Sequence, residues 1–78
     1  MEDAMESERS AELLLRLARW LINKDGLLTT RSLQAAFDED ASLRPHFPQG
    51  FQFVLRQLLL RGNLREEVVD GMNVLVIV

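Results

Sequence analysis

REEVVDGMNVLVIV, the stretch from Arg65 to Val78, joins two apolar runs through an Asp-Gly pair. Asp70-Gly71 is the strongest short-range signal for a β-hairpin, because its two-residue turn needs positive φ at both central positions. The run from Met72 to Val78 is rich in β-branched residues, which favour strands. The stretch therefore predicts a β-hairpin with acids on its first strand and almost none on its second.

The segment before the hairpin, PQGFQFVLRQLLLRG (residues 48–62), predicts a helix. Pro48 suits the first helical position, and Gly62 followed by Asn63 suits the helix end. Apolar residues at helical spacing predict a buried seam, made of Phe51, Val54, Leu55, Leu58 and Leu59. The preceding segment, DEDASLRPHFPQG (residues 38–50), contains three consecutive acids and two prolines and predicts a loop.

Two further helices and a short strand are expected closer to the N-terminus. SAELLLRLARWLINKDG (residues 10–26) places apolar residues on one helical face, with Ser7 or Ser10 as the expected cap. LLTT (residues 27–30) is long enough to pair as a short strand beside the hairpin. Thr29 or Thr30 can then cap a second helix, TRSLQAAF.

The charge of the chain is unevenly distributed. Residues 1–12 carry five acids and one base, whereas the other 66 residues carry eight bases and seven acids, so the net charge of −3 divides into −4 and +1. We expect residues 1–9 to form an acidic, flexible N-terminal arm. Residues 10–78 are expected to form one α+β domain, mainly α, with three helices, a short strand and a C-terminal β-hairpin.

The composition restricts the compartment and the class of protein. Apolar residues make up 47% and charged residues 27%, which is ordinary for a folded globular domain. The chain contains no cysteine, which excludes disulfides and fits a reducing compartment, so we expect an intracellular protein of the cytoplasm or nucleus. No apolar run approaches the roughly 18 to 20 residues that span a bilayer, so no membrane contact is expected.

The order of the expected elements resembles the winged helix-turn-helix superfamily, in which the hairpin is called the wing. The resemblance is one of order and spacing and singles out no narrower family. It rests on LLRLARWLI, LLTT, SLQAAF, FQFVLRQLLLRG and VVDGMNVLVIV. One departure is the linker of residues 38–47, which is longer and more acidic than the tight turn of many DNA-reading members.

The resemblance implies a DNA-binding alternative, because the third helix of winged-helix regulators typically enters the major groove. The polar residues outside the apolar seam of that helix would then read bases, and two arginines would lie near phosphates. These candidates are Gln49, Gln52, Arg56 and Gln57 for the bases, and Arg61 and Arg65 for the phosphates. The alternative interpretation is the solvated face of an amphipathic helix.

The hairpin favours protein contact instead. Glu66, Glu67 and Asp70 would oppose a phosphate backbone. VLVIV (residues 74–78) is apolar on both alternating faces and needs a cover, either from a dimer mate, a partner or the rest of a longer protein, or from the acidic arm and the first helix of the same chain. The partner-binding candidates are Phe53, Leu60, Val76, Ile77 and Val78.

No motif for catalysis or metal binding is recognisable. His46 is the only histidine and has no cysteine to join it as a ligand, so we expect no metal there. The acids from Asp38 to Asp40 lack the spacing of a calcium loop. We therefore expect a non-catalytic interaction module without cofactor or small-molecule substrate, which forms a homodimer or docks a protein partner. The alternative is a DNA-binding domain of a transcription regulator.

Overall fold

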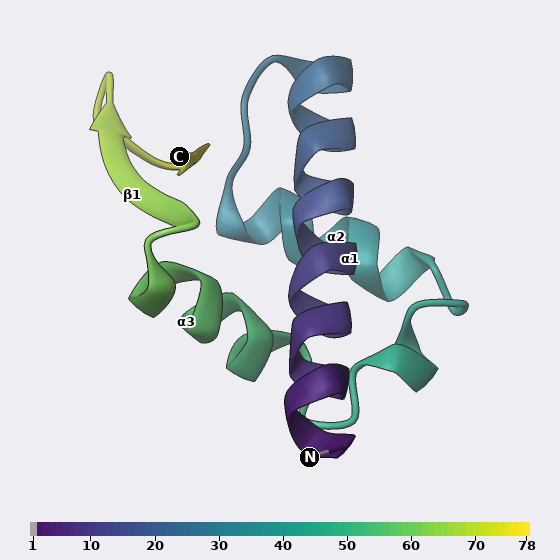
Figure 1. The fold of residues 1–78 in the computed structure, drawn as a ribbon. Coiled ribbons are helices and arrows are strands. Elements are labelled where there is room, and N and C mark those ends of the chain that lie inside the picture. The colour runs from purple at the N-terminus through teal and green to yellow at the C-terminus, as the bar shows by residue number, and fades with distance from the viewer. Residues whose placement is uncertain (1) are drawn as a thin grey trace.

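The computed structural model describes residues 2–78, with side chains from residue 8 onward. Three helices are followed by a two-stranded antiparallel hairpin (Figure 1). The elements are α1 (Glu2–Asp25), α2 (Thr30–Glu39), the 3-10 turn η1 (Arg44–His46), α3 (Phe51–Arg61), β1 (Leu64–Val69) and β2 (Met72–Ile77). This confirms the expected α+β fold, mainly α, and its order is compatible with a winged-helix architecture.

Helix α1 starts earlier than the sequence analysis expected. Its backbone runs from Glu2, so Ser10 lies inside the helix and does not cap it. Ser10 is buried, and its hydroxyl donates a hydrogen bond to the carbonyl oxygen of His46, which ties η1 to α1. Met1 and the side chains of residues 2–7, including Ser7, lie outside the described part, so the flexible arm of residues 1–9 stays a prediction.

Helix α2 begins with the cap that the sequence predicted. The Ser32 amide donates to the Thr29 hydroxyl oxygen at 3.0 Å, and the Thr29 amide donates to the Ser32 hydroxyl oxygen at 3.0 Å. This reciprocal pair satisfies two backbone donors that a helix start leaves open. The helix buries Leu33 and Phe37.

The segment between α2 and α3 is anchored by aromatic rings. Phe47 is buried, with its ring centroid 4.7 Å from that of Phe37, and Phe51 follows at 5.3 Å from Phe37. The expected start of α3 at Pro48 is wrong. Gly50 has a φ of 90°, which a helix cannot continue through, so Pro48 and Gln49 lie in a turn and α3 begins at Phe51.

Helix α3 has the predicted seam and the predicted end. Phe51, Val54, Leu55 and Leu58 are buried, and Leu59 is half-buried. Gly62 closes the helix in the left-handed conformation, with a φ of 81°, and its amide donates to the carbonyl oxygens of the last turn. The chain then enters β1 two residues later.

The hairpin turn is the predicted one. Asp70 and Gly71 have φ of 51° and 78°, as the two-residue turn requires, and the strands pair from Leu64 with Ile77 to Val69 with Met72. The expected strand at residues 27–30 did not form. Only one backbone hydrogen bond joins this segment to the hairpin, from the Leu75 amide to the Leu28 oxygen at 2.8 Å. Thr29 already caps α2, so the chain leaves the sheet after Leu28.

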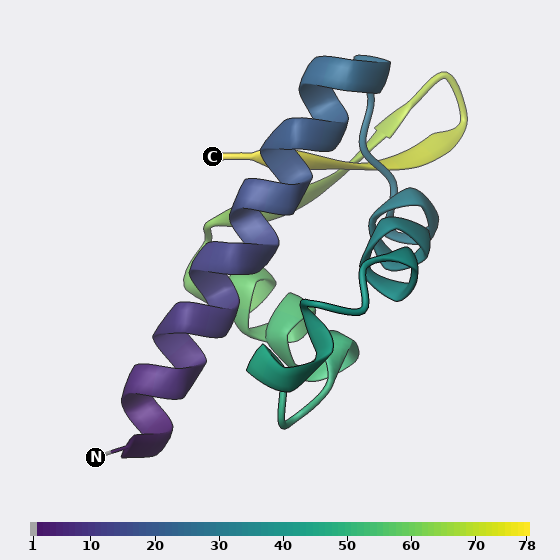
Figure 2. The same cartoon turned by 90° about the vertical axis from the view of Figure 1, so that its right-hand side faces the viewer.

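The core lies between the three helices and the base of the hairpin. The most buried large side chains come from the three helices, the segment before α2 and the start of β1: Leu14, Leu28, Leu33, Leu58 and Leu64. Turned by 90°, the ribbon shows the hairpin projecting from the helices, with its turn far from the core (Figure 2). The hairpin therefore has a packed base and an extended tip.

Candidate functional site: two hollows beside the hairpin

The register of the hairpin assigns its residues to two faces, because paired residues of an antiparallel ladder lie on the same side. One face carries the pairs Leu64–Ile77 and Glu66–Leu75 and packs toward the core. The other face carries three pairs: Arg65–Val76, Glu67–Val74 and Val69–Met72. We call this second face the outer face.

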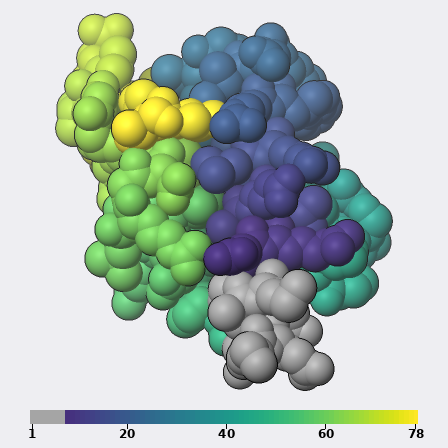
Figure 3. Space-filling model, in the orientation of Figure 1, coloured from purple at the N-terminus to yellow at the C-terminus, as the bar shows by residue number. Residues whose placement is uncertain are grey.

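The first hollow, the apolar trough, has a volume of about 570 Å³ and lies between the end of α1 and the hairpin. Two of its lining side chains are polar, those of Arg19 and Asn23. The remaining lining residues are Ile22, Gly26, Leu27, Leu28, Val69, Val74, Leu75, Val76 and Ile77. The space-filling view shows the yellow C-terminal end of β2 between the rest of the hairpin and α1 (Figure 3).

The side chains of the apolar trough differ in exposure. Val74 is buried and Val76 is half-buried, whereas Leu27 keeps 41% and Val69 keeps 44% of its surface exposed. Met72, paired with Val69 on the outer face, is 49% exposed. The trough therefore has a covered apolar floor and an apolar rim that remains in contact with water.

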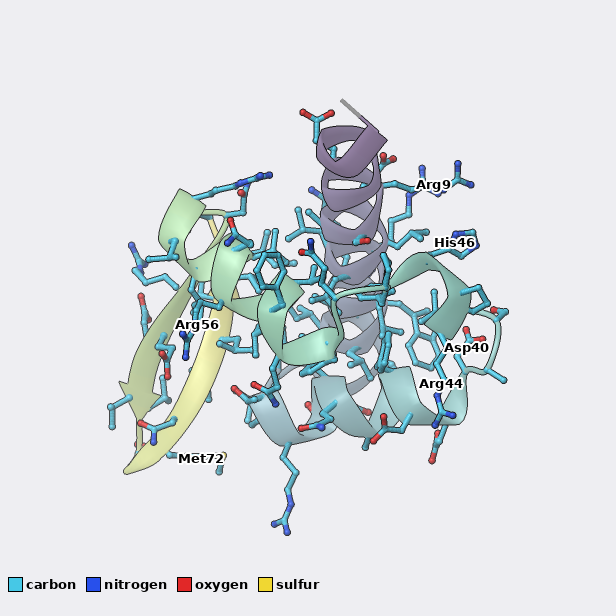
Figure 4. The ribbon with its side chains drawn as sticks, turned by 90° about the horizontal axis from the view of Figure 1, so that it is seen from below. Arg9, Asp40, Arg44, His46, Arg56 and Met72 are labelled. Atoms are coloured by element: carbon cyan, nitrogen blue, oxygen red, sulfur yellow. The ribbon has the colours of Figure 1, made fainter. Side chains whose placement is uncertain are left out.

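The second hollow, the α3 hollow, has a volume of about 510 Å³ and lies between α3 and β1. Its lining residues are Gln52, Phe53, Leu55, Arg56, Leu59 and Glu66. Arg56 lies between α3 and the hairpin, whereas Met72 lies at the hairpin tip (Figure 4). Since one cation and one anion line this hollow, its electrostatic character is mixed, unlike that of the apolar trough.

The predicted partner-binding residues do not form a single surface. Phe53 lines the α3 hollow and is 41% exposed, whereas Val76 and Ile77 line the apolar trough. Leu60 is 75% exposed on α3 and lines neither hollow. Val78 is 74% exposed beyond the end of β2.

The predicted DNA-reading residues are also dispersed. Gln52 and Arg56 are exposed and share the α3 hollow, and Gln52 donates a hydrogen bond to Gln34 of α2. Gln49 precedes α3, and Gln57 is half-buried on the helix. Two arginines lie elsewhere: Arg61 borders a third hollow together with Glu8, Glu12, Arg16 and Arg19 of α1, and Arg65 lies on the outer face.

The acids of the hairpin lie on both of its faces. Glu66 lines the α3 hollow and is exposed, which places a negative charge beside Arg56. On the outer face, Arg65 donates from Nε to a carboxylate oxygen of Glu67 at 2.9 Å. This exposed pair contributes little to stability, about 0 to 1 kcal/mol. The pair places a carboxylate beside Arg65, one of the candidate phosphate ligands.

Sequence reasoning missed several residues of the apolar trough: Arg19, Ile22, Leu27 and Val69. The hairpin signal alone could have found Val69, since a two-residue turn at Asp70-Gly71 fixes the pairing of Val69 with Met72. Arg19 and Leu27 gave no such signal, because their position beside β2 depends on how α1 packs on the hairpin.

The described residues contain neither a metal cluster nor a membrane span. From residue 8 onward, no three histidine or acidic side chains come close enough together to hold a metal ion. Within residues 2–78, no helix combines the length and the apolar character that crossing a bilayer requires. No protein-family model matches the chain, and no curated protein and no solved structure matches it.

Proposed function

We propose that this chain is a non-catalytic winged-helix-like module that works by protein contact, with its apolar trough as the main binding surface. One observation carries the proposal: an apolar hollow with an exposed apolar rim lies beside a hairpin that projects from the core. The order of helices and hairpin supports the winged-helix assignment. The absence of cysteine supports an intracellular location.

The rim of the trough gives a physical reason for a partner. Leu27 and Val69 of the rim, together with Met72, which pairs with Val69 at the hairpin tip, each leave between 41% and 49% of their surface in water. Covering apolar surface contributes about 25 cal/mol for each Å² that leaves water. Clustered exposed apolar side chains around a concave floor are typical of interaction sites.

The charges beside α3 argue against nucleic acid as the partner. Glu66 lines the same hollow as Gln52 and Arg56, so a duplex that reached these side chains would meet a carboxylate at the same place. Each added negative charge near phosphates opposes association. The chain as a whole carries a net charge of −3, which supplies no attraction for a polyanion.

DNA binding through α3 is the second candidate function. It is favoured by the exposure of Gln52 and Arg56 side by side in the α3 hollow, since glutamine can pair with adenine and arginine with guanine. Under this alternative, α3 would enter the major groove and the hairpin would lie along the backbone. The apolar trough would have no part in it.

A titration of the protein with mixed-sequence duplex DNA at low salt distinguishes the two candidates. Protein contact predicts no binding even at low salt. Micromolar binding that weakens steeply with added salt would overturn the proposal, because such a slope measures the counterions that phosphate contacts release.

Reversing the two glutamates of β1 supplies the companion experiment. We expect Glu66→Lys combined with Glu67→Lys to create nonspecific DNA affinity, since it reverses the carboxylate beside Arg56 and the carboxylate that binds Arg65. The matched control is Asp38→Lys with Glu39→Lys, which changes the net charge equally at exposed positions at the end of α2. Equal gains in the two variants would show that net charge alone, and not the face beside α3, governs binding.

A further inference from the structure

We propose that the apolar trough holds the hairpin tip of a second copy of this chain, so that two chains form a two-fold symmetric dimer with each tip in the other's trough. This inference rests on the proposed function, because it names the protein that the trough contacts. It is carried by the match in apolar character and in charge between the tip and the trough of the same molecule.

The tip is apolar on its outer face and acidic at its end. Val69 and Met72 pair across the strands, and both are about half exposed. The turn that joins them carries the carboxylate of Asp70, which has a φ of 51°. A tip that enters a hollow with this face therefore presents two apolar side chains, followed by one negative charge.

The trough has an apolar part and a positive charge, which complement the apolar side chains and the negative charge of the tip. Its rim near the helix end is apolar, at Gly26 and Leu27, and its polar lining begins with Arg19. Arg19 lies two helical turns before Gly26, which is about 10 Å along α1. The guanidinium of Arg19 therefore lies at the end of the trough that is far from the hairpin turn of the same chain.

Two-fold symmetry brings these features together in complementary pairs. When the two outer faces pack antiparallel about a two-fold axis near Val74, Val69 and Met72 of one copy lie opposite Val76 of the other. The same arrangement moves the Asp70 carboxylate toward the second copy's Arg19. Because the contact is isologous, each favourable pair occurs twice.

The border of the outer face on the β1 side is charged. Arg65 pairs with Val76, and Glu67 pairs with Val74, so one cation and one anion flank the apolar floor on the β1 side. Because Glu67 lies level with Val74, the same axis sets the two Glu67 carboxylates opposite each other, and each is held by the Arg65 of its own copy. An apolar centre with a polar border is the usual anatomy of a protein interface.

The mass of the full chain in solution gives the first test. We expect sedimentation equilibrium to show a reversible dimer, with an affinity better than about 1 mM, the limit of a weak encounter. A single monomeric species throughout this range would overturn the dimer. Failure of the dimer proposal is distinguishable from failure of the proposed function, because a monomeric chain that works by protein contact would still lack DNA affinity.

A charge exchange tests the geometry of the dimer. Arg19→Glu and Asp70→Lys should each weaken self-association by about tenfold or more, because each variant sets like charges against each other at both tips. An equimolar mixture of the two variants should associate as a heterodimer, because both contacts between positions 19 and 70 then join opposite charges. A mixture that associates no better than the separate variants would overturn the proposed arrangement.

Two controls keep the charge exchange interpretable. Arg16→Glu makes the same change of charge on α1, but Arg16 does not line the apolar trough, so the variant should leave dimerisation unchanged. Asp70→Asn removes the charge and tolerates the left-handed turn, so its association should fall without loss of folding measured by circular dichroism. An equal loss of association in Arg16→Glu and Arg19→Glu would overturn the assignment of Arg19.

The apolar part of the contact has a matched pair of variants at adjacent positions. Val69→Ser lies on the outer face and should weaken dimerisation by about tenfold, whereas Val68→Ser lies on the opposite face and should not change it. Both side chains are exposed, so both variants should fold. Equal effects at the two positions would place the contact on a different face and overturn the proposal.

Discussion

At the base of the hairpin, Leu64 and Leu75 keep 1% and 4% of their surface exposed, whereas Val68 and Met72 at the tip keep 71% and 49%. The two regions have similar apolar character and belong to the same two strands. They differ in what lies beneath them, since α3 and α1 pack on the base and neither reaches the tip. Apolar side chains therefore stabilise the fold at one end of the hairpin and remain available for contact at the other.

The largest effect is expected from truncation at the base. Leu75→Ala should lower the free energy of unfolding by about 2 to 4 kcal/mol, because it leaves a cavity beside Leu28 and the helices. Urea denaturation followed by circular dichroism measures the loss. Since a domain of this size has few kcal/mol to lose, Leu75→Val provides a milder variant. A change within 0.5 kcal/mol would contradict the assignment of the base to the core.

A pair of neighbouring residues on β2 sharpens the comparison between the two faces. Ile77 pairs with Leu64 and packs against the core, whereas Val76 pairs with Arg65 on the outer face. Ile77→Lys should therefore cost more stability than Val76→Lys, by about 1 to 2 kcal/mol. Thermal unfolding of the two variants checks this order. Dimerisation, in contrast, should be lost in the well-folded Val76→Lys protein.

A substitution in the turn that joins β1 and β2 should have an intermediate effect on stability. Gly71→Ala forces a side chain into a φ of 78° and should cost about 1 kcal/mol. Amide exchange along β2 would show whether the hairpin opens locally or the domain unfolds as a whole. As a control, Asp70→Asn should change stability little, because asparagine also suits this turn. Equal stability of Gly71→Ala and the parent would contradict the assigned turn.

The smallest effect is expected at Val68, which is more exposed than Val69 and Met72. Val68→Thr should change the free energy of unfolding by less than about 0.5 kcal/mol, since the side chain of Val68 is 71% exposed. The same denaturation experiment that measures Leu75→Ala measures this variant. A loss above 1 kcal/mol would remove the distinction between base and tip.

Local signals were sufficient to predict most of the elements. The Asp70-Gly71 turn, the Thr29 cap and the Gly62 helix end depend on backbone conformations of adjacent residues, and all three were confirmed. The predicted start of α3 at Pro48 was wrong because the positive φ of Gly50 interrupts the helical backbone, so the helix begins after it. The strand at residues 27–30 was wrong because Thr29 serves the helix instead of the sheet.

The candidate site was less predictable than the elements. Phe53, Val76 and Ile77 do line hollows, but they line two different ones, and Leu60 lines neither. The residues that complete the apolar trough, Arg19 and Leu27, come from parts of the chain distant from the hairpin in sequence. A periodic pattern describes which face of an element is apolar and not which other element comes to lie beside it.

The sequence by itself determined three helices, a hairpin with its register, and acids on that hairpin, because turns, caps and periodicity act over a few residues. Only the tertiary structure decided which apolar residues of the hairpin are buried and which are exposed. That division depends on where α1 ends and how far α3 extends beneath the strands, which are properties of packing between distant segments. The apolar trough exists for the same reason.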